Sequence, residues 1–428
     1  MNEQLKIIAI ILFFATYALL LVFPGKRAHI AVVSAVIYVA TGIMPVDKVF
    51  FTVNWNVILM IAGTMGTVSL FIESKMPALL GDIIIAKTPN VKWAIIALSL
   101  FSGIISAFVD NVATVLMVAP VALTIAKKLD ISPVTPIIAI AISSNLQGVA
   151  TLVGDTTSIL LGGQAGLDFL DFFVYQGKVG IFWVVQISAI ASALVLLIVF
   201  RKYSQPISAE SRASVTDYIP TVLLAGTIVL LILVSFIPAA YKPEIINGLI
   251  CVVFFLIGVI RECIKQKSVT VIKAALKEID AFTLILLAGL FLVVGGINEA
   301  GIIEDISKFF VKVSGDNVFV VYTLIVWFSV LVSAIIDNIP YVATMLPVVA
   351  GIAVILDVSP ILLYFGLLSG ATLGGNLTPI GASANITALG ILRKDGHKVR
   401  SLDFMKISVP FTLAAVVTGY ILIWLIWA

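Results

Sequence analysis

Apolar residues form runs of about 20 along the whole chain, and short polar segments separate these runs. A helix of this length crosses the roughly 30 Å hydrocarbon core of a bilayer. The pattern predicts an all-α polytopic membrane protein with ten full crossings, at residues 5–23, 28–45, 55–72, 134–163, 178–201, 219–239, 244–260, 281–300, 360–391 and 405–427. The longest polar connections are about 201–217 and 261–280, so we expect residues 1–428 to form a single membrane domain.

Two further apolar segments, 93–127 and 317–356, are too long for one helix, and each has an Asp-Asn pair near its centre. Each segment is either one tilted crossing or a re-entrant hairpin that enters and leaves on the same side. The positive-inside rule favours the hairpins, because they place most basic loops on one face. With both termini outside an inner membrane, the inner face receives Lys26, Arg27, Lys87, Lys92, Lys127, Lys128, Arg201, Lys202, Arg212, Arg261, Lys265, Lys267, Lys273, Lys277, Arg393, Lys394, Lys398 and Arg400.

The chain contains an internal repeat. A shift of 227 aligns residues 101–158 with 328–385 without a gap and gives 19 identities in 58 positions. Self-similarity on this scale indicates a duplicated unit. Each half holds five crossings, an odd number, so the two copies must run in opposite directions through the membrane. We therefore predict two inverted five-span repeats, 1–201 and 219–428, each with a re-entrant hairpin (93–127 and 317–356) and a broken span (134–163 and 360–391).

Composition agrees with a membrane protein, since 61% of residues are hydrophobic and only 11% are charged. A soluble domain carries about 25% charged residues. The two cysteines form no CxxC pair, and the sequence shows no phosphate-binding glycine loop and no nucleophile–base pair. These observations favour a protein that is not an enzyme, needs no cofactor and binds no nucleic acid.

Each half of the repeat contains a polar hairpin tip followed by a broken span rich in Gly, Thr and Asn. Inverted repeats with broken helices that meet at the midplane are the architecture of secondary transporters. Irregular backbone at membrane depth is tolerated only where it is buried in protein or lines a cavity. The alternative is that these small residues only help helices to pack. Our candidate substrate- and ion-binding residues are Ser106, Asp110, Asn111, Thr114, Asn145, Thr151, Gly154, Asp155, Thr156, Ser333, Asp337, Asn338, Asn376, Thr378, Gly381, Ser383 and Asn385.

Three of these candidates, Asp110, Asp155 and Asp337, are acids inside apolar runs. A carboxylate in the membrane costs at least a few kcal/mol unless it is protonated or paired. No Lys or Arg falls at their predicted depth, so we expect a proton, a bound cation, water or a helix dipole to compensate them. This predicts H⁺ or Na⁺ coupling, with a sodium site at Asp110, Asn111, Asp337 and Asn338. The alternative is that Asp110 and Asp337 only cap helices.

At residues 110–114, 337–344 and 374–385 the chain resembles the ion transporter superfamily: arsenite permeases, NhaD-type sodium/proton antiporters, the P protein branch and, more distantly, dicarboxylate and citrate symporters. The resemblance covers nearly the whole chain. It implies a homodimer with a scaffold domain and a moving transport domain, working by elevator-type alternating access. In the dicarboxylate symporters a Ser-Asn-Thr triplet at each tip helps bind sodium and substrate. Here 110–112 and 337–339 take its place, and the added aspartates would repel a dicarboxylate.

The leading hypothesis is a proton- or sodium-coupled permease for a small inorganic ion or oxyanion, arsenite-permease-like. Uncharged arsenous acid would need no basic residue in the site. One alternative is a sodium/proton antiporter, and another is a sodium-coupled symporter of a carboxylate or other anion. A passive channel is disfavoured, because hairpins entering from opposite faces would occlude a continuous pore.

Overall fold

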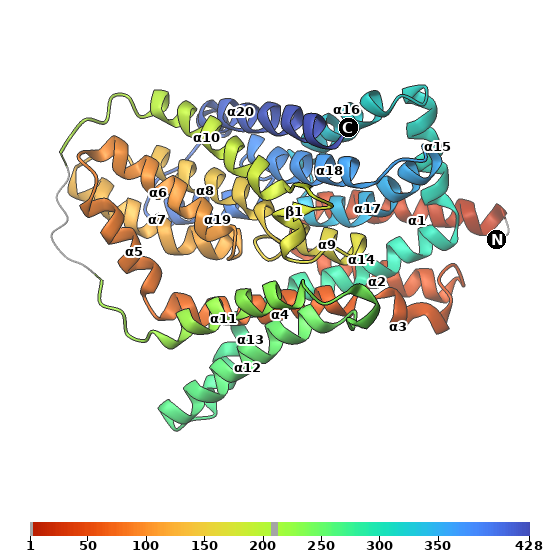
Figure 1. Ribbon diagram of the computed structural model, residues 1–428, viewed down its shortest axis with the longest axis horizontal. Helices are drawn as coiled ribbons and strands as arrows, with labels where there is room; N and C mark the ends of the chain where they lie inside the picture. The colour runs from red at the N-terminus through yellow and green to blue at the C-terminus, as the bar shows by residue number, and fades with distance from the viewer. Residues whose placement is uncertain (1–2, 207–212) are drawn as a thin grey trace.

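The computed structural model describes residues 3–206 and 213–428, and helices make up nearly all of it (Figure 1). Arg212, one of the basic residues that we assigned to the inner face, lies outside the described residues. The first half, with 3₁₀ helices labelled η, contains α1 (Glu3–Val22), η1 (Pro24–Lys26), α2 (Arg27–Ala40), η2 (Val46–Lys48), α3 (Val49–Thr52), α4 (Trp55–Glu73), α5 (Met76–Ala86), α6 (Val91–Ser106), α7 (Asn111–Lys128), α8 (Val134–Gln147), η3 (Gly148–Ala150), α9 (Thr156–Ala165), η4 (Leu170–Phe172), β1 (Val174–Tyr175), β2 (Lys178–Val179) and α10 (Ile181–Val199).

The second half contains α11 (Ile219–Val234), η5 (Ala239–Tyr241), α12 (Ile246–Gln266), α13 (Thr270–Glu278), α14 (Ala281–Glu299), α15 (Ile302–Ser314), α16 (Val318–Ser333), α17 (Asn338–Ile355), α18 (Ile361–Gly374), η6 (Gly375–Leu377), α19 (Ser383–Lys394) and α20 (Ser401–Trp427). The two short strands form an antiparallel pair in which Val174 lies opposite Val179. Among the described residues, eight helices are long and apolar enough to cross a membrane. The predicted all-α polytopic fold is confirmed.

The two halves repeat the same order of elements. The series α4, α5, α6–α7, α8–η3–α9, α10 corresponds to α14, α15, α16–α17, α18–η6–α19, α20. Apolar periodicity did not predict α5 and α15 as separate helices, because they are only 11 and 13 residues long, too short for a crossing. Helix α15 turns into α16 with a bend of 116°, so it leads directly into the second hairpin segment.

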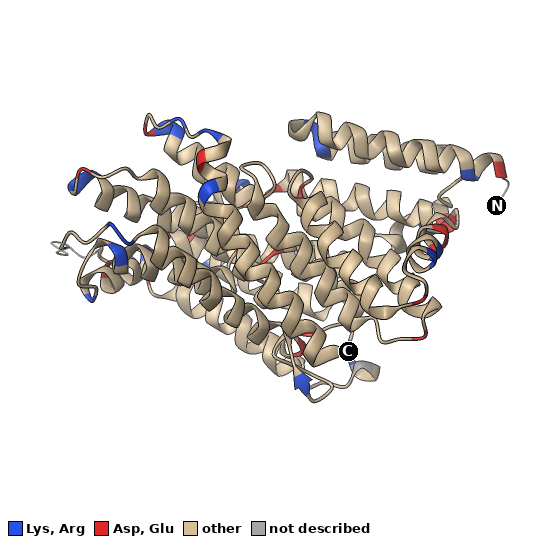
Figure 2. Cartoon of the chain, turned by 90° about the horizontal axis from the view of Figure 1, so that it is seen from above, with Lys and Arg blue, Asp and Glu red and all other residues tan. Residues whose placement is uncertain are grey.

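Contacts between the halves join the repeats into one body. Helix α10 packs on α20, while α2 of the first half packs on α14 and α12 of the second half packs on α4. The N-terminal pair α1–α2 is therefore attached to the second repeat. Helix α1 starts at the right of Figure 2 and runs toward the middle of the molecule.

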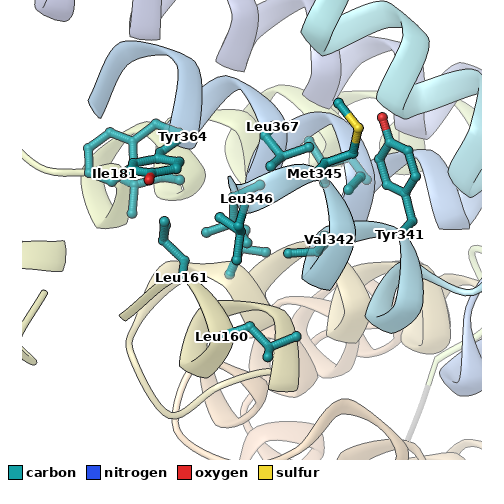
Figure 3. Packing of buried hydrophobic residues seen from close by; sticks show 14 of the residues in the cluster. Leu160, Leu161, Ile181, Tyr341, Val342, Met345, Leu346, Tyr364 and Leu367 are labelled. Atoms are coloured by element: carbon teal, nitrogen blue, oxygen red, sulfur yellow. The ribbon is translucent and has the colours of Figure 1, made fainter. Parts of the chain in front are cut away.

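A buried apolar cluster holds the first broken span against the second hairpin. Leu160 and Leu161 of α9 face Val342 and Leu346 of α17 in the interior, and Leu367 of α18 lies beside them (Figure 3). Each of these five side chains is at most 3% exposed. Because α9 starts directly after Asp155, this packing places that aspartate close to the second repeat.

Lys and Arg residues lie mainly at one end of the helical bundle, at the left of Figure 2. At the start of α11, Asp217 accepts hydrogen bonds from Arg261 at 2.6 Å and from Lys265 at 3.0 Å. These cations hold the pKa of the Asp217 carboxyl well below its ordinary value. The charge asymmetry agrees with the distribution used for the positive-inside argument, while the orientation in a membrane stays a prediction.

Candidate functional site

The hairpin tips are capped helix starts. Asp110 precedes α7, and its Oδ1 accepts the backbone N–H groups of Val112 at 2.9 Å and Ala113 at 3.1 Å. Asp337 precedes α17, and its Oδ1 accepts the N–H of Ile339 at 3.2 Å. Such side-chain caps satisfy orphan donors of the first helical turn. Helix capping by both aspartates is confirmed, and it uses one carboxylate oxygen of each, which leaves Oδ2 for another partner.

Arg27 fills that second position at Asp337. Its Nη1 donates to Asp337 Oδ2 at 2.8 Å, in a pair whose side chains are only 15% and 11% exposed. Our expectation that no basic residue compensates these acids is therefore wrong for Asp337. Arg27 follows a long apolar run and so has the sequence signature of a loop residue on the inner face. In the structure, the turn between α1 and α2 instead meets the second hairpin tip.

The other two acids have no such partner. Within the described ranges, no Lys or Arg forms an ion pair with Asp110 or Asp155. Asp155 is 5% exposed and stands directly before α9, where its Oδ2 accepts a hydrogen bond from Thr157 Oγ1 at 2.8 Å. For these two residues the expected compensation is still a proton, a bound cation, water or the dipole of the helix that each precedes.

Each broken span lies directly against its hairpin tip. Thr151 donates from Oγ1 to the carbonyl of Ala107, and Thr378 donates in the same way to Ala334. The glycines between span and tip leave no room for a side chain. A Cβ on Gly154 would lie 2.7 Å from the Ser106 carbonyl oxygen, and one on Gly381 would lie 2.8 Å from that of Ser333. Because residues 154 and 381 are glycines, the backbone of each broken span can contact the backbone of its hairpin tip.

An asparagine ladder crosses the centre between the two repeats. Asn111 at the first tip donates to Asn145 Oδ1 at 2.9 Å, and Asn145 donates to Asn376 Oδ1 at 3.1 Å. Asn376 in turn donates to the Ile142 carbonyl at 2.9 Å, and Asn145 also reaches the carbonyl of Thr372 at 2.8 Å. Asn145 and Asn376 are 0% exposed, so these bonds join the two broken spans in a site shielded from solvent.

Replacing Asn145 with Leu should destabilise the protein by about 1–3 kcal/mol. The substitution leaves the side-chain N–H of Asn111 and the side-chain oxygen of Asn376 without their hydrogen-bond partner. The change is measurable as a lower midpoint of thermal unfolding of the purified protein. Thr124 is an exposed position on α7 whose Oγ1 donates to the carbonyl of Pro120 one turn back, so Thr124→Val serves as the control. An equal midpoint for Asn145→Leu and Thr124→Val would contradict a structural role of the ladder.

A cavity of about 240 Å³ opens between the tips and the start of α14. Its lining includes six of our candidates, which come from both tips and both broken spans: Asp110, Asn111, Asp155, Thr156, Asn338 and Ser383. It also includes Glu278, Asp280 and Thr283, which sequence reasoning missed. The cavity wall thus carries four carboxyl groups, and among the described residues that line it there is no Lys or Arg. A cavity with this charge attracts cations and repels anions.

A weak signal for the missed residues was present. Asp280 caps α14, accepting from the N–H of Thr283 at 3.2 Å. The sequence Asp-Ala-Phe-Thr before an apolar run has the form of a helix start. Nothing in the sequence indicates that this cap faces the first hairpin tip.

The remaining candidates do not line this cavity. Ser106 and Ser333 are 0% exposed, and their hydroxyls have no hydrogen-bond partner within the described residues. Asn385 donates to the carbonyls of Gly375 and Thr378, each at 3.1 Å. The others are Thr114, Asn145, Thr151, Gly154, Asp337, Asn376, Thr378 and Gly381. No group of three or more His, Cys, Asp or Glu side chains that could hold a metal ion occurs in the part of the chain that the structure describes.

The helical fold, the matched broken spans and the polar cavity between them define a multi-pass membrane transport protein. Residues 17–370 match the family model of CitMHS, described as citrate transporter. The chain therefore belongs to the CitMHS citrate transporter family. This confirms the resemblance to the ion transporter superfamily.

Similar proteins include transporters and the P protein. An uncharacterized transporter of Mycobacterium tuberculosis is 29% identical over 98% of this chain and 99% of its own length. The P protein of Mus musculus is 27% identical over 77% of this chain, and the match spans only 49% of that longer protein. Together with the family match, these relatives indicate a secondary transporter of the CitMHS and P protein type.

Two solved structures share the fold at low sequence identity. The YdaH transporter of Alcanivorax borkumensis, described as having an unusual topology, superposes with a TM-score of 0.62 at 14% identity and covers 88% of this chain and 86% of its own. MtrF of Neisseria gonorrhoeae, described within a class of antimetabolite efflux pumps, gives a TM-score of 0.52 at 16% identity, with 95% and 83% covered. At these identities the likeness concerns the fold alone.

Proposed function

We propose that this protein is a cation-coupled secondary transporter in which Asp110 and Asp155 bind the coupling ion, H⁺ or Na⁺, at the cavity between the tips. The observation that carries the proposal is the acidic lining: Asp110 and Asp155 face the same space, and no basic side chain lines it in the described part of the chain. Two carboxylates in a site of low dielectric repel each other unless a cation or proton joins them.

The same charges restrict the transported solute. A bare oxyanion or a free carboxylate would meet four carboxyl groups and no countercharge in the lining. The solute that fits is a small inorganic species that is uncharged, such as arsenous acid, or that enters together with cations. A sodium-coupled symporter of carboxylate or other anions requires such accompanying cations. Serine and asparagine donors, as at Asn338 and Ser383, would then orient the solute beside the ion.

The test is uptake of labelled arsenite and labelled citrate into proteoliposomes, with a sodium gradient and a proton gradient imposed separately. We expect one of the two cation gradients to drive uptake above the level of protein-free liposomes. Asp155→Asn should reduce the driven uptake at least about tenfold, because a neutral amide cannot balance a cation. Solute accumulation in liposomes that is unaffected by both gradients would contradict cation coupling.

Sodium/proton antiport is the second candidate, and the excess of acids over bases in the cavity favours it. In this mode Asp110 and Asp155 would exchange the two cations directly without a further solute. Everted vesicles loaded with a pH dye distinguish the two functions. Proton release on addition of sodium, in the absence of arsenite and citrate, supports antiport, whereas release that requires the solute supports the permease.

The proposal includes the expected assembly and motion. A homodimer in an inner membrane, with both termini outside, would hold a scaffold domain in place while the hairpins and broken spans move in an elevator-type cycle. The broken spans and hairpin tips support this scheme, since their half-helices pack on one another across the repeats. Accessibility of single cysteines at the cavity-lining positions Ala113 and Ile339 to membrane-impermeant thiol reagents from either side would test it.

A further inference from the structure

The two hairpin tips differ in the partner of one atom, the Oδ2 oxygen of the tip aspartate. Both tip aspartates use Oδ1 to cap the returning helix. At the second tip, Oδ2 of Asp337 receives Arg27, whereas at the first tip no basic residue in the described ranges pairs with Asp110. The second tip aspartate therefore pairs with a cation that belongs to the chain, whereas the first tip aspartate faces the acidic cavity.

Arg27 reaches Asp337 from a different structural unit. It starts α2, which packs on α14, while Asp337 belongs to the hairpin α16–α17. A second contact supports the approach: the hydroxyl of Tyr17 on α1 donates to the Pro340 carbonyl at 2.9 Å. Tyr17 also bonds the hydroxyl of Thr344 one turn further along. The pair α1–α2 therefore contacts the second hairpin both at its tip, through Asp337, and along the first turns of α17, through Pro340 and Thr344.

Burial gives the ion pair a consequence for the number of cations that the chain can bind. Asp337 is 8% exposed as a residue, and a buried carboxylate is costly unless a cation lies beside it. The guanidinium is permanently charged and supplies that cation from within the chain. A mobile ion has no net charge left to balance at Asp337 while Arg27 is in place.

We propose that Arg27 is a tethered counter-cation, which takes at the second tip the place that a mobile H⁺ or Na⁺ takes at the first, so that each chain has one exchangeable cation site in place of two. The inference rests on the proposed function for the identity of the first site. It makes Arg27 a positioning residue that sets the coupling ratio without touching the transported solute. Its role at Asp337 is independent of whether Asp110 binds the coupling ion.

The experiment counts the mobile cations that the full-length protein holds in nanodiscs at neutral pH, with two probes. One is ²²Na⁺ by equilibrium binding, and the other is protons by potentiometric titration from neutral pH to about pH 9, below the range in which lysine and arginine release protons. Arg27→Gln should bind one more cation per chain than the wild type, because Asp337 is then unpaired. The double variant Arg27→Gln/Asp337→Asn should return to the wild-type number. Arg27→Lys keeps the charge and should match the wild type, as should Lys26→Gln, which removes a neighbouring exposed charge.

Equal proton and sodium counts for Arg27→Gln and the double variant would overturn the proposal. Asp337→Asn alone gives a second test if Arg27→Gln does not fold. It should leave the wild-type count unchanged, and loss of one cation in this variant would show that a mobile ion binds at Asp337 and would also overturn the proposal. Failure of the proposed function gives a different result: Asp110→Asn and Asp155→Asn would leave the count unchanged, while the difference between Arg27→Gln and the double variant persists.

Discussion

Replacing Asp110 with Asn should reduce cation-driven uptake about 100-fold or more while the protein still inserts and folds. Asparagine is as good a helix cap as aspartate, so the start of α7 keeps its bonds to Val112 and Ala113. The substitution removes only the negative charge at the cavity. A lost interaction with a charged group amounts to about 1.5–3 kcal/mol, which corresponds to roughly 10- to 100-fold in binding, and loss of coupling adds to it.

The measurement is the initial rate of solute uptake in proteoliposomes, divided by the amount of protein inserted. Asp316→Asn is the matched control, because Asp316 is exposed, lies in the turn before α16 and has a positive φ of 59° that asparagine also tolerates. We expect the control to transport as the wild type does. Uptake by Asp110→Asn at the rate of the control would remove this carboxylate from the coupling mechanism.

Replacing Gly154 with Ala should lower stability by about 1–3 kcal/mol and disrupt the site, because a methyl group at this position overlaps backbone atoms. The new Cβ would lie 2.4 Å from the Gly148 carbonyl oxygen and 2.8 Å from that of Ala107. Backbone atoms cannot move aside as a flexible side chain can. The first broken span must therefore withdraw from the tip, and Asp155, the next residue, moves with it.

The matched control is Gly390→Ala in α19, where nothing lies within 4 Å of the position that the new Cβ would take. There alanine should be neutral or stabilising by up to about 1 kcal/mol, as expected from helix propensity. The comparison uses the midpoint of thermal unfolding together with uptake. If both variants unfold at the same temperature as the wild type, the close contact between span and tip is not required for the fold.

The repeat explains why much of the candidate site could be predicted from the sequence. Asp110 and Asp337, with Asn111 and Asn338, occur at equivalent positions because duplication copied the local structure, and a helix cap depends only on its neighbours in sequence. For the same reason the breaks near Gly154 and Gly381 were predictable from small residues and threonines. Thr372 aligns with Asn145 under the same shift, and this signal could have shown its place in the ladder.

Departures from the repeat depend on contacts between distant segments. Arg27 pairs with a residue 310 positions away, and hydropathy places it at a span end without specifying what that end faces. Glu278 and Asp280 join the cavity only because α14 starts opposite the first tip. Such contacts follow from how helices pack, and the packing partner of an apolar face is not encoded in its periodicity.

By itself the sequence determined the helical membrane fold, the duplication and the polar tips, because hydrophobic length, helix capping and internal similarity are properties of local sequence. Only the tertiary structure decided which of the acids is neutralised from within the chain and which ones line an acidic cavity. The physical reason is that the charge state of a buried carboxylate depends on what lies within a few ångströms of it, and those neighbours come from helices far apart in the chain.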